Sequence, residues 1–302
     1  MKVTRLPDVE RIPPGERAGG RSVAVGTFDG VHLGHREVIA GADSVLTFEP
    51  HPVSVVAPQH TPKLLTTLAR KAELVAALGV RELIVIPFDA EFARRSAREF
   101  IDDVLVGALD ARQVAVGENF RFGHKAQGDP PLLAADARFQ TVVYPLLEVE
   151  GEVVSSSHIR GLVLAGEVAE ADRLLGAGFE LAGEVVHGDE RGRELGFPTA
   201  NLVPDEALAC PGHGVYACVA YADGLPELPA AVSIGVRPTF NTGRGELIEA
   251  YLLDFAGDLY GAQLHLRFLE RLRGERRFED PDALVEQMGR DVRRTREIVS
   301  TA

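Results

Sequence analysis

Short apolar runs alternate with stretches of helical periodicity over the first half of the chain. Each run is four or five residues long and rich in β-branched residues, which is typical of buried strands. The runs cover residues 22–25, 44–48, 82–86, 113–116 and 141–144. Because strands that alternate with helices are joined by crossovers, the pattern predicts a parallel sheet with helices on its faces.

Helix signals lie between several of these runs. Apolar residues at helical spacing predict a helix over residues 67–78, with Gly79 placed to end it. The segment Ser96-Ala97-Arg98-Glu99 fits a capping box and predicts a second helix start. A third helical stretch is expected over residues 167–175.

The pattern changes after this third helix to a series of strands. They are expected over residues 179–186, 215–221, 230–234, 247–255 and 263–269, with Gly, Pro and Asp turns between them. Five or six such strands predict a small closed barrel, followed by a helix that begins near Asp280-Pro281. The change of pattern predicts two domains, residues 1–177 and residues 178–302.

Composition and charge narrow the function classes. The chain has 302 residues, 45% of them apolar, and a formal net charge of −13. A general nucleic-acid binder needs a broad basic surface, so nucleic acid is not an expected partner and any phosphate site must be local. No apolar run reaches the roughly 20 residues of a membrane span, and no signal peptide is evident, so no membrane partner and a cytoplasmic location are expected. Cys210 and Cys218 are expected to be buried, reduced thiols. The oligomeric state stays open.

The ten residues from Gly26 to His35 read GTFDGVHLGH and lie between the first expected strand and a helix. Glycines let the backbone turn tightly, and a helix start offers free N–H groups to an anion. His32 and His35 are three residues apart, so both imidazoles can face one phosphate. The plain alternative is a glycine-rich turn with two structural histidines, which His-x-Gly-His alone does not exclude.

The full ten-residue string resembles the FAD synthetase branch of the nucleotidylyltransferase superfamily. Three more segments match that branch: FEPHP at 48–52, GENFRFG at 117–123 and SSSHIR at 155–160. The resemblance implies that ATP is bound by Gly26, Phe28, Asp29, His32, His35, Ser156 and Arg160, and that Asn119 and Phe120 belong to a flavin pocket. Taken alone, the serine run is a helix cap with a solvated arginine, and Phe120 and Phe122 are more often core aromatics.

A second patterned string lies in the predicted barrel, at residues 183–202, and contains GDERGRELGFPTAN. Its glycines allow a loop to fold over phosphates, and Thr199 and Asn201 offer neutral oxygens that suit Mg²⁺ shared with a phosphate. Without the surrounding string, Pro-Thr-Ala-Asn is a turn and a strand start. A lone glutamate in an apolar strand, such as Glu249, usually faces solvent.

This string is similar to the riboflavin kinase family. The resemblance implies that Gly188, Gly192, Arg193, Thr199 and Asn201 bind ATP, with Thr199 and Asn201 as metal ligands. It implies that Glu249 is the catalytic base, since phosphorylation of a primary hydroxyl calls for one. Arg273 and Phe278 fall in a segment that resembles the family's flap near the flavin ring.

Together the two strings resemble the bacterial bifunctional riboflavin kinase/FAD synthetase family over nearly the whole chain. This implies a Rossmann-like nucleotidylyltransferase domain followed by a Greek-key-type riboflavin kinase barrel, with riboflavin, FMN and ATP as substrates and Mg²⁺ as the metal. Only twelve residues separate His35 from Phe48, which predicts a short crossover helix. Two alternatives stay open: a riboflavin kinase with an impaired adenylyltransferase domain, and a degenerate enzyme that only binds flavin.

Overall fold

The computed structural model describes residues 1–8, 20–188, 196–235 and 247–301. The chain forms two compact units, Met1–Ser156 and Ser157–Ala302. This division assigns the segment 157–177 to the second unit, so the expected boundary at residue 177 stays a prediction.

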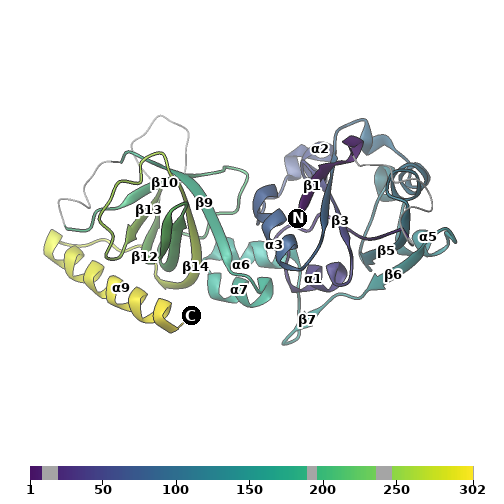
Figure 1. The fold of residues 1–302 in the computed structure, drawn as a ribbon. Coiled ribbons are helices and arrows are strands. Elements are labelled where there is room, and N and C mark those ends of the chain that lie inside the picture. The colour runs from purple at the N-terminus through teal and green to yellow at the C-terminus, as the bar shows by residue number, and fades with distance from the viewer. Residues whose placement is uncertain (9–19, 189–195, 236–246, 302) are drawn as a thin grey trace. The chain divides into compact units, whose positions relative to one another are not determined.

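The first unit is built on a six-stranded parallel sheet with the order β1-β4-β3-β2-β5-β6 (Figure 1). The strands are β1 (Lys2–Arg5), β2 (Arg21–Val25), β3 (Ser44–Glu49), β4 (Glu82–Pro87), β5 (Ala111–Gly117) and β6 (Gln140–Tyr144). The five expected strands are therefore confirmed. The edge strand β1 was not predicted, because only one of its four residues is buried.

Strand order reverses between β2 and β5. The chain passes from β2 to β3 and β4 on one side, and then to β5 and β6 on the other. In open parallel sheets, ligands bind outside the carboxyl ends of the strands at such a switch point. The loops after Val25 and Gly117 both begin there.

Local sequence signals account for the helices of this unit. Helix α3 (Leu68–Ala77) is capped by the Thr67 hydroxyl, and the expected capping box of Ser96 and Glu99 begins α4 (Ala97–Glu99). After α4 the helix widens into a π-helix, η4 (Phe100–Ala108), which the sequence did not predict. The remaining elements are η1 (Leu6–Asp8), α1 (Leu33–Ile39), α2 (Pro52–Val56), η2 (Pro58–His60), η3 (Phe92–Arg94), η5 (His124–Ala126), α5 (Pro130–Ala134), β7 (Glu148–Val149) and β8 (Glu152–Val153).

The crossover helix α1 has seven residues, as the short spacing predicted. Val38 and Ile39 of α1 are buried against Val75 of α3 and against the sheet residues Val45 and Leu83. This face of the sheet is covered in spite of the short helix. The other face is buried by η4, whose Phe100, Ile101 and Val104 belong to a second cluster.

The second unit is a closed antiparallel barrel with the order β10-β13-β12-β11-β14-β9. Its strands are β9 (Phe179–Val186), β10 (Ala200–Pro204), β11 (Gly214–Ala222), β12 (Leu225–Gly235), β13 (Leu247–Leu252) and β14 (Gln263–Arg273). β14 returns beside β11, so β14-β11-β12-β13 is a Greek key and the expected architecture is confirmed.

The described residues of the second unit include the helices α6 (Ser156–Ala165, whose first residue falls in the first unit), α7 (Val168–Leu175) and α9 (Pro281–Thr301). α9 packs along β11, β12 and β14. Because the helix covers the outer face of β11, this strand is buried on both faces, as the consecutive buried residues Tyr216, Ala217 and Cys218 show.

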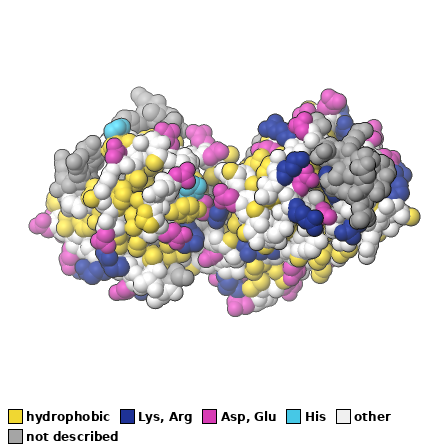
Figure 2. Space-filling view, in the orientation of Figure 1, with side chains coloured by type: hydrophobic (Ala, Val, Ile, Leu, Met, Phe, Trp, Pro, Cys, Tyr) yellow, Lys and Arg dark blue, Asp and Glu magenta, His cyan; other side chains and the backbone are white. Residues whose placement is uncertain are grey.

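Both cysteines are buried thiols that form no disulfide, as expected. Of the helices in the described part of the chain, none is long and apolar enough to cross a membrane. On the face drawn in Figure 2, Lys and Arg side chains are scattered among Asp and Glu side chains.

Candidate active sites

The loop between β2 and α1 is held in place by its neighbours along much of its length. The Asp29 carboxylate accepts hydrogen bonds from the backbone N–H groups of Leu65 (2.8 Å) and Thr66 (3.2 Å). The Ser156 hydroxyl donates to the carbonyl of Asp29 at 2.9 Å. Phe28 has a φ of 49°, a left-handed conformation that costs a non-glycine residue about 1–2 kcal/mol. These contacts stabilise a loop shape that the sequence alone would disfavour.

His32 caps the N-terminus of α1 through its side chain. Its Nδ1 accepts a hydrogen bond from the backbone N–H of His35 at 3.2 Å. In the neutral ring the proton must then be on Nε2, which remains able to donate. The two imidazoles stack with ring centroids 3.5 Å apart and planes inclined by 17°. The two rings therefore lie against each other, and the expectation that both face one phosphate stays a prediction.

Both histidines are neutral at pH 7. Burial lowers the pKa of His32 from 6.5 to about 4. Burial also lowers the pKa of His35 well below 6.5, and the positive charges of His32 and Lys71 add to this effect. His35 Nδ1 is buried without a hydrogen-bond partner. Neutral imidazoles can donate a hydrogen bond to a phosphate, but they are not permanent cations.

A cavity of about 880 Å³ opens beside this loop, at the switch point of the sheet. Gly26 and Phe28 line it from the loop after β2, His35 lines it from α1, and Asn119 and Phe120 line it from the loop after β5. The structure thus brings together five of the residues expected in the adenylyltransferase site. Their individual roles stay predictions.

One part of the cavity wall is apolar and aromatic. Its members share rings or branched side chains: Phe48, Val53, Phe88, Phe92, Phe120 and Phe122. Phe122 is also part of the core, whereas Phe120 is only partly buried against it, and the two rings stack at 5.5 Å. This pair of rings therefore both packs in the core and lines the cavity. A flat, largely apolar ring system matches such a wall.

The other part of the wall is basic. Its side chains are Arg94, Arg95, Arg121, His124 and Lys125, and none of them was singled out from the sequence. They come from η3, η5 and the adjoining loops, beyond the carboxyl ends of β4 and β5. The sequence did contain one sign of this wall: basic residues cluster in two short segments, although the chain as a whole has a net charge of −13. The expected local phosphate site stays a prediction, and these side chains offer positive charge for it.

Three expected ATP ligands, Asp29, His32 and Ser156, are outside the set of residues that line the cavity. In this structure Asp29 and Ser156 hold the loop, and His32 fixes His35. Arg160 lies on α6 in the second unit. A direct contact of these four residues with ATP stays a prediction.

In the second unit, Asn201 of β10 stands opposite Glu249 of β13, and Glu249 stands opposite Ser233 of β12. Directly opposed residues of antiparallel strands point to the same face. The next pair along, Leu202 and Ile248, is buried, so Asn201 and Glu249 belong to the outer face of the barrel. Glu249 is the outward-facing member of its strand, as the alternation predicted, and it lies beside the Pro-Thr-Ala-Asn segment.

The Gly188 backbone is pressed against the side chain of Asn201. A Cβ at position 188 would lie 2.2 Å from Asn201 Nδ2, which no real contact permits. Phe197 packs edge-on against Tyr251, two residues beyond Glu249, with ring centroids 5.3 Å apart. Close packing thus joins the ends of the glycine-rich string to one patch of the barrel. Gly192 and Arg193 lie outside the described residues, and their ATP contacts stay predictions.

The expected flavin residues Arg273 and Phe278 lie together, with the guanidinium carbon 5.7 Å from the ring centroid. The guanidinium also binds Asp291 of α9, from Nε at 3.0 Å and from Nη2 at 2.9 Å. The segment after β14 is therefore tied to the C-terminal helix. Glu275 of this segment approaches Gly235, since a Cβ there would lie 2.5 Å from Glu275 Oε1. Gly235 is two residues beyond Ser233, so the segment passes near the Glu249 patch.

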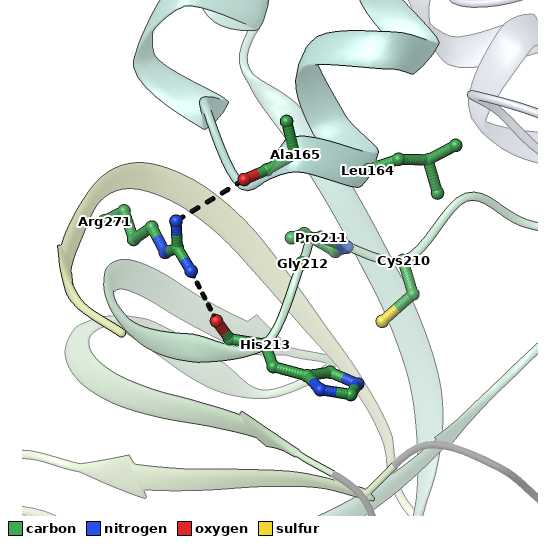
Figure 3. Close-up of a pocket in the computed structure, with 7 residues that line it drawn as sticks. All are labelled: Leu164, Ala165, Cys210, Pro211, Gly212, His213 and Arg271. Atoms are coloured by element: carbon green, nitrogen blue, oxygen red, sulfur yellow. Dashed lines mark hydrogen bonds between the residues drawn. The ribbon is translucent and has the colours of Figure 1, made fainter. Parts of the chain in front are cut away.

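A smaller cavity of about 460 Å³ in the second unit contains none of the expected residues (Figure 3). Arg271 donates across it to the carbonyls of His213 (2.6 Å) and Ala165 (3.4 Å). Cys210 and Leu164 line the same space. The arginine joins the end of α6 to the segment that enters β11, which is a structural role.

Comparison with known proteins agrees with this division of the chain. A family model for FAD synthetase matches residues 16–158, and one for riboflavin kinase matches residues 175–299. A protein of Listeria monocytogenes named bifunctional riboflavin kinase/FMN adenylyltransferase is 38% identical over 287 residues, 91% of each chain. The chain belongs to the bifunctional riboflavin kinase/FMN adenylyltransferase family.

Other members of the riboflavin kinase/FMN adenylyltransferase family are similar at the same level. The protein of that name from Escherichia coli is 38% identical over 92% of each chain, and that from Bacillus subtilis is 36% identical over 89% of each chain. A crystal structure titled macrolide-efflux protein, from Streptococcus pneumoniae, superimposes with a TM-score of 0.86 at 30% identity. The superposition covers 98% of this chain and 99% of the other chain, so both units have the same fold in the two proteins.

Proposed function

We propose that this chain phosphorylates riboflavin to FMN in its second unit and joins FMN to AMP in its first unit, giving FAD. The observation that carries the proposal is the cavity at the switch point of the sheet, which is lined by His35 of the stacked imidazole pair, by an aromatic wall and by a basic wall. It combines the two chemistries that FAD synthesis requires, because one substrate is a flat flavin and the other a polyphosphate. A degenerate protein that only binds flavin would need the aromatic wall but not the basic wall.

In the first unit, an FMN phosphate oxygen attacks the α-phosphorus of ATP. The new bond is the phosphoanhydride of FAD, and the bond that breaks links the α-phosphorus to the departing pyrophosphate. Negative charge builds up on oxygen during this exchange, and fixed donors stabilise it. His35 lies at the cavity wall and His32 holds it by stacking, so the pair is suited to donate neutral hydrogen bonds. Arg94, Arg95 and Lys125 supply positive charge to the phosphates.

In the second unit, the ribityl 5′-hydroxyl of riboflavin attacks the γ-phosphorus of ATP, and ADP leaves. Glu249 takes the hydroxyl proton. The support for this role is its place opposite the buried Asn201, on the outer face of the barrel, where Glu249 itself is partly exposed. A carboxylate in this position can act as a base at neutral pH.

Mg²⁺ fits the residues of this patch. Thr199 and Asn201 offer neutral oxygens, and Mg²⁺ prefers oxygen ligands. The ion usually keeps several of its coordination positions for water and phosphate oxygens. The described residues contain no cluster of three His, Cys, Asp or Glu side chains that would form an all-protein metal site. We infer that Thr199 and Asn201 hold the ion together with ATP. When bound, it neutralises phosphate charge.

A cytoplasmic location stays a prediction.

The adenylyltransferase half is tested by supplying FMN, ATP and Mg²⁺ to the purified protein and measuring FAD and pyrophosphate in equal amounts. His35→Leu should lower the rate about 10²-fold or more, since it removes a fixed donor. The matched control is the riboflavin kinase rate of the same variant, which should not change. A wild-type protein that makes FMN but neither FAD nor pyrophosphate would be a kinase only, and this half of the proposal would fail.

A further inference from the structure

Lys71 is buried in the first unit, although lysine is among the residues least often found inside proteins. Only 6% of the residue is exposed. It lies on α3, three residues after Leu68 and four before Val75, and both of these apolar residues pack in the core under the sheet. A charge at this position of an amphipathic helix is costly unless it is paired. Its contacts therefore indicate why it is there.

The Lys71 ammonium contacts the loop that carries the paired histidines. Nζ donates to the backbone carbonyl of Thr27 at 2.7 Å and lies 3.4 Å from Thr47 Oγ1. The Thr47 hydroxyl donates to the same carbonyl at 3.0 Å. The carbonyl of Thr27 is thus fixed by two donors, one of them charged, at the point where the chain leaves β2.

The peptide that follows this carbonyl leads to the cavity wall. Phe28 takes up its left-handed conformation immediately after Thr27, and its ring lies over Gly26, where a Cβ would come within 3.0 Å of ring atoms. The ring also packs edge-on against His35, with centroids 5.3 Å apart. A continuous series of contacts therefore joins Lys71 to His35 through Thr27 and Phe28. Gly26, Phe28 and His35 all line the cavity.

Charged and titratable groups lie near the ammonium. Asp29 in the loop and Glu49 at the end of β3 attract it, and their charges oppose the effect of burial, which lowers the pKa of Lys71. His35 of α1 is also close enough to feel its charge, which contributes to the low pKa of His35. On α3 itself, Arg70 and Glu73 pair with each other at 2.8 Å.

We propose that Lys71 is a positioning residue for adenylyl transfer: it fixes the Thr27 carbonyl and, through Phe28, the placement of His35 at the cavity wall. The inference rests on the proposed adenylyltransferase function of the first unit. Lys71 does not line the cavity, so it acts through its neighbours and not on the substrate. A second consequence is electrostatic, because the same cation favours the neutral form of His35.

The test compares Lys71→Met, which removes both donor and charge, with Lys71→Gln, which keeps a donor, and Lys71→Arg, which keeps the charge. Lys2→Met, at the exposed start of β1, is the matched control. In Lys71→Met we expect kcat for FAD formation from FMN to fall about 10²-fold, the size typical of a misplaced reacting group, with a smaller change in KM for ATP. The riboflavin kinase rate of each variant should equal that of the wild type.

The pH profile separates positioning from a structural role alone. Without the cation, the pKa of His35 rises, so the acid limb of kcat for FAD formation should move to higher pH in Lys71→Met and Lys71→Gln. Lys71→Arg should keep the wild-type limb. A folded Lys71→Met enzyme with wild-type kcat and limb would overturn the inference. Should Lys71→Met not fold, a folded Lys71→Gln enzyme with wild-type kcat and limb would overturn it equally. Absence of FAD formation in the wild type would instead overturn the proposed function.

Discussion

Asn201 and Glu249 stand opposite each other on neighbouring strands, 48 positions apart in the sequence. The pairing places an amide oxygen suited to a metal–phosphate complex beside a carboxylate suited to a hydroxyl proton. Gly188 closes the same patch by lying against Asn201. The barrel register thus assembles a candidate kinase site from three separate segments, and it makes the following variants informative.

Glu249→Gln removes the proposed base and keeps the size of the side chain. We expect riboflavin phosphorylation to slow by about 10²–10⁴-fold, the range for loss of a general base. FAD formation from supplied FMN should stay at the wild-type rate, because the first unit has its own site. Steady-state assays of both reactions on one preparation measure this. A variant that phosphorylates riboflavin as fast as the wild type would remove Glu249 from the mechanism.

Gly188→Ala introduces a Cβ where the amide of Asn201 already lies, 2.2 Å away. Either the loop or Asn201 must move, so we expect a loss of riboflavin kinase activity of at least about tenfold, with FAD formation from FMN intact. Gly161→Ala on α6 is the matched control, since a Cβ there meets no atom within 4 Å. Equal kinase rates in the two variants would show that the close approach of Gly188 has no function.

Asp291→Asn breaks the charge pair between α9 and the segment after β14. Asp291 is 6% exposed, and the guanidinium of Arg273 would lose an ionised partner, so the barrel should be destabilised by about 1–3 kcal/mol. We also expect KM for riboflavin to rise, because Arg273 and Phe278 would no longer be held together. Denaturant unfolding and kinase kinetics measure the two effects. Wild-type stability together with a wild-type KM would contradict the proposed role of the ion pair between Arg273 and Asp291.

Acid should lower the free energy of unfolding of the first unit. The pKa of His32 is about 4 when folded and 6.5 when unfolded, so between these values the unfolded chain binds more protons. The free energy of unfolding is then complete above pH 6.5 and falls as the pH drops toward 4, by up to about 1.4 kcal/mol per pH unit. Hydrogen exchange of the β2 and β5 amides, corrected for the intrinsic rate, reports this. His32→Gln should show a shallower slope, and an unchanged slope would contradict the assignment.

The strands and their order of appearance could be predicted from the sequence because burial on both faces leaves continuous apolar runs, as in Leu83-Ile84-Val85-Ile86. The edge strand β1 could not, since Lys2, Val3 and Arg5 are exposed and only Thr4 is buried. The π-helical widening at Phe100–Ala108 also left no pattern, because its apolar spacing is close to that of an ordinary helix.

The candidate sites were predictable where one short string carries them and hidden where the fold assembles them. GTFDGVHLGH forms one loop, so its residues are neighbours in both sequence and structure. Arg94, Arg95 and Lys125 meet only because parallel strands place their following loops at one edge of the sheet. Lys71 did leave a signal, a cation at a core position of a predicted helix, but its meaning depends on Thr27, 44 residues away.

The most direct test of two separate sites in one chain follows riboflavin, FMN and FAD by chromatography after riboflavin, ATP and Mg²⁺ are mixed with the purified protein. The account predicts that riboflavin disappears, that FMN rises and then falls, and that FAD and pyrophosphate accumulate together. In Glu249→Gln, FMN should form slowly from riboflavin, whereas added FMN should be converted to FAD at the normal rate. Accumulation of FMN in the wild type without FAD, or loss of both reactions in Glu249→Gln, would contradict it.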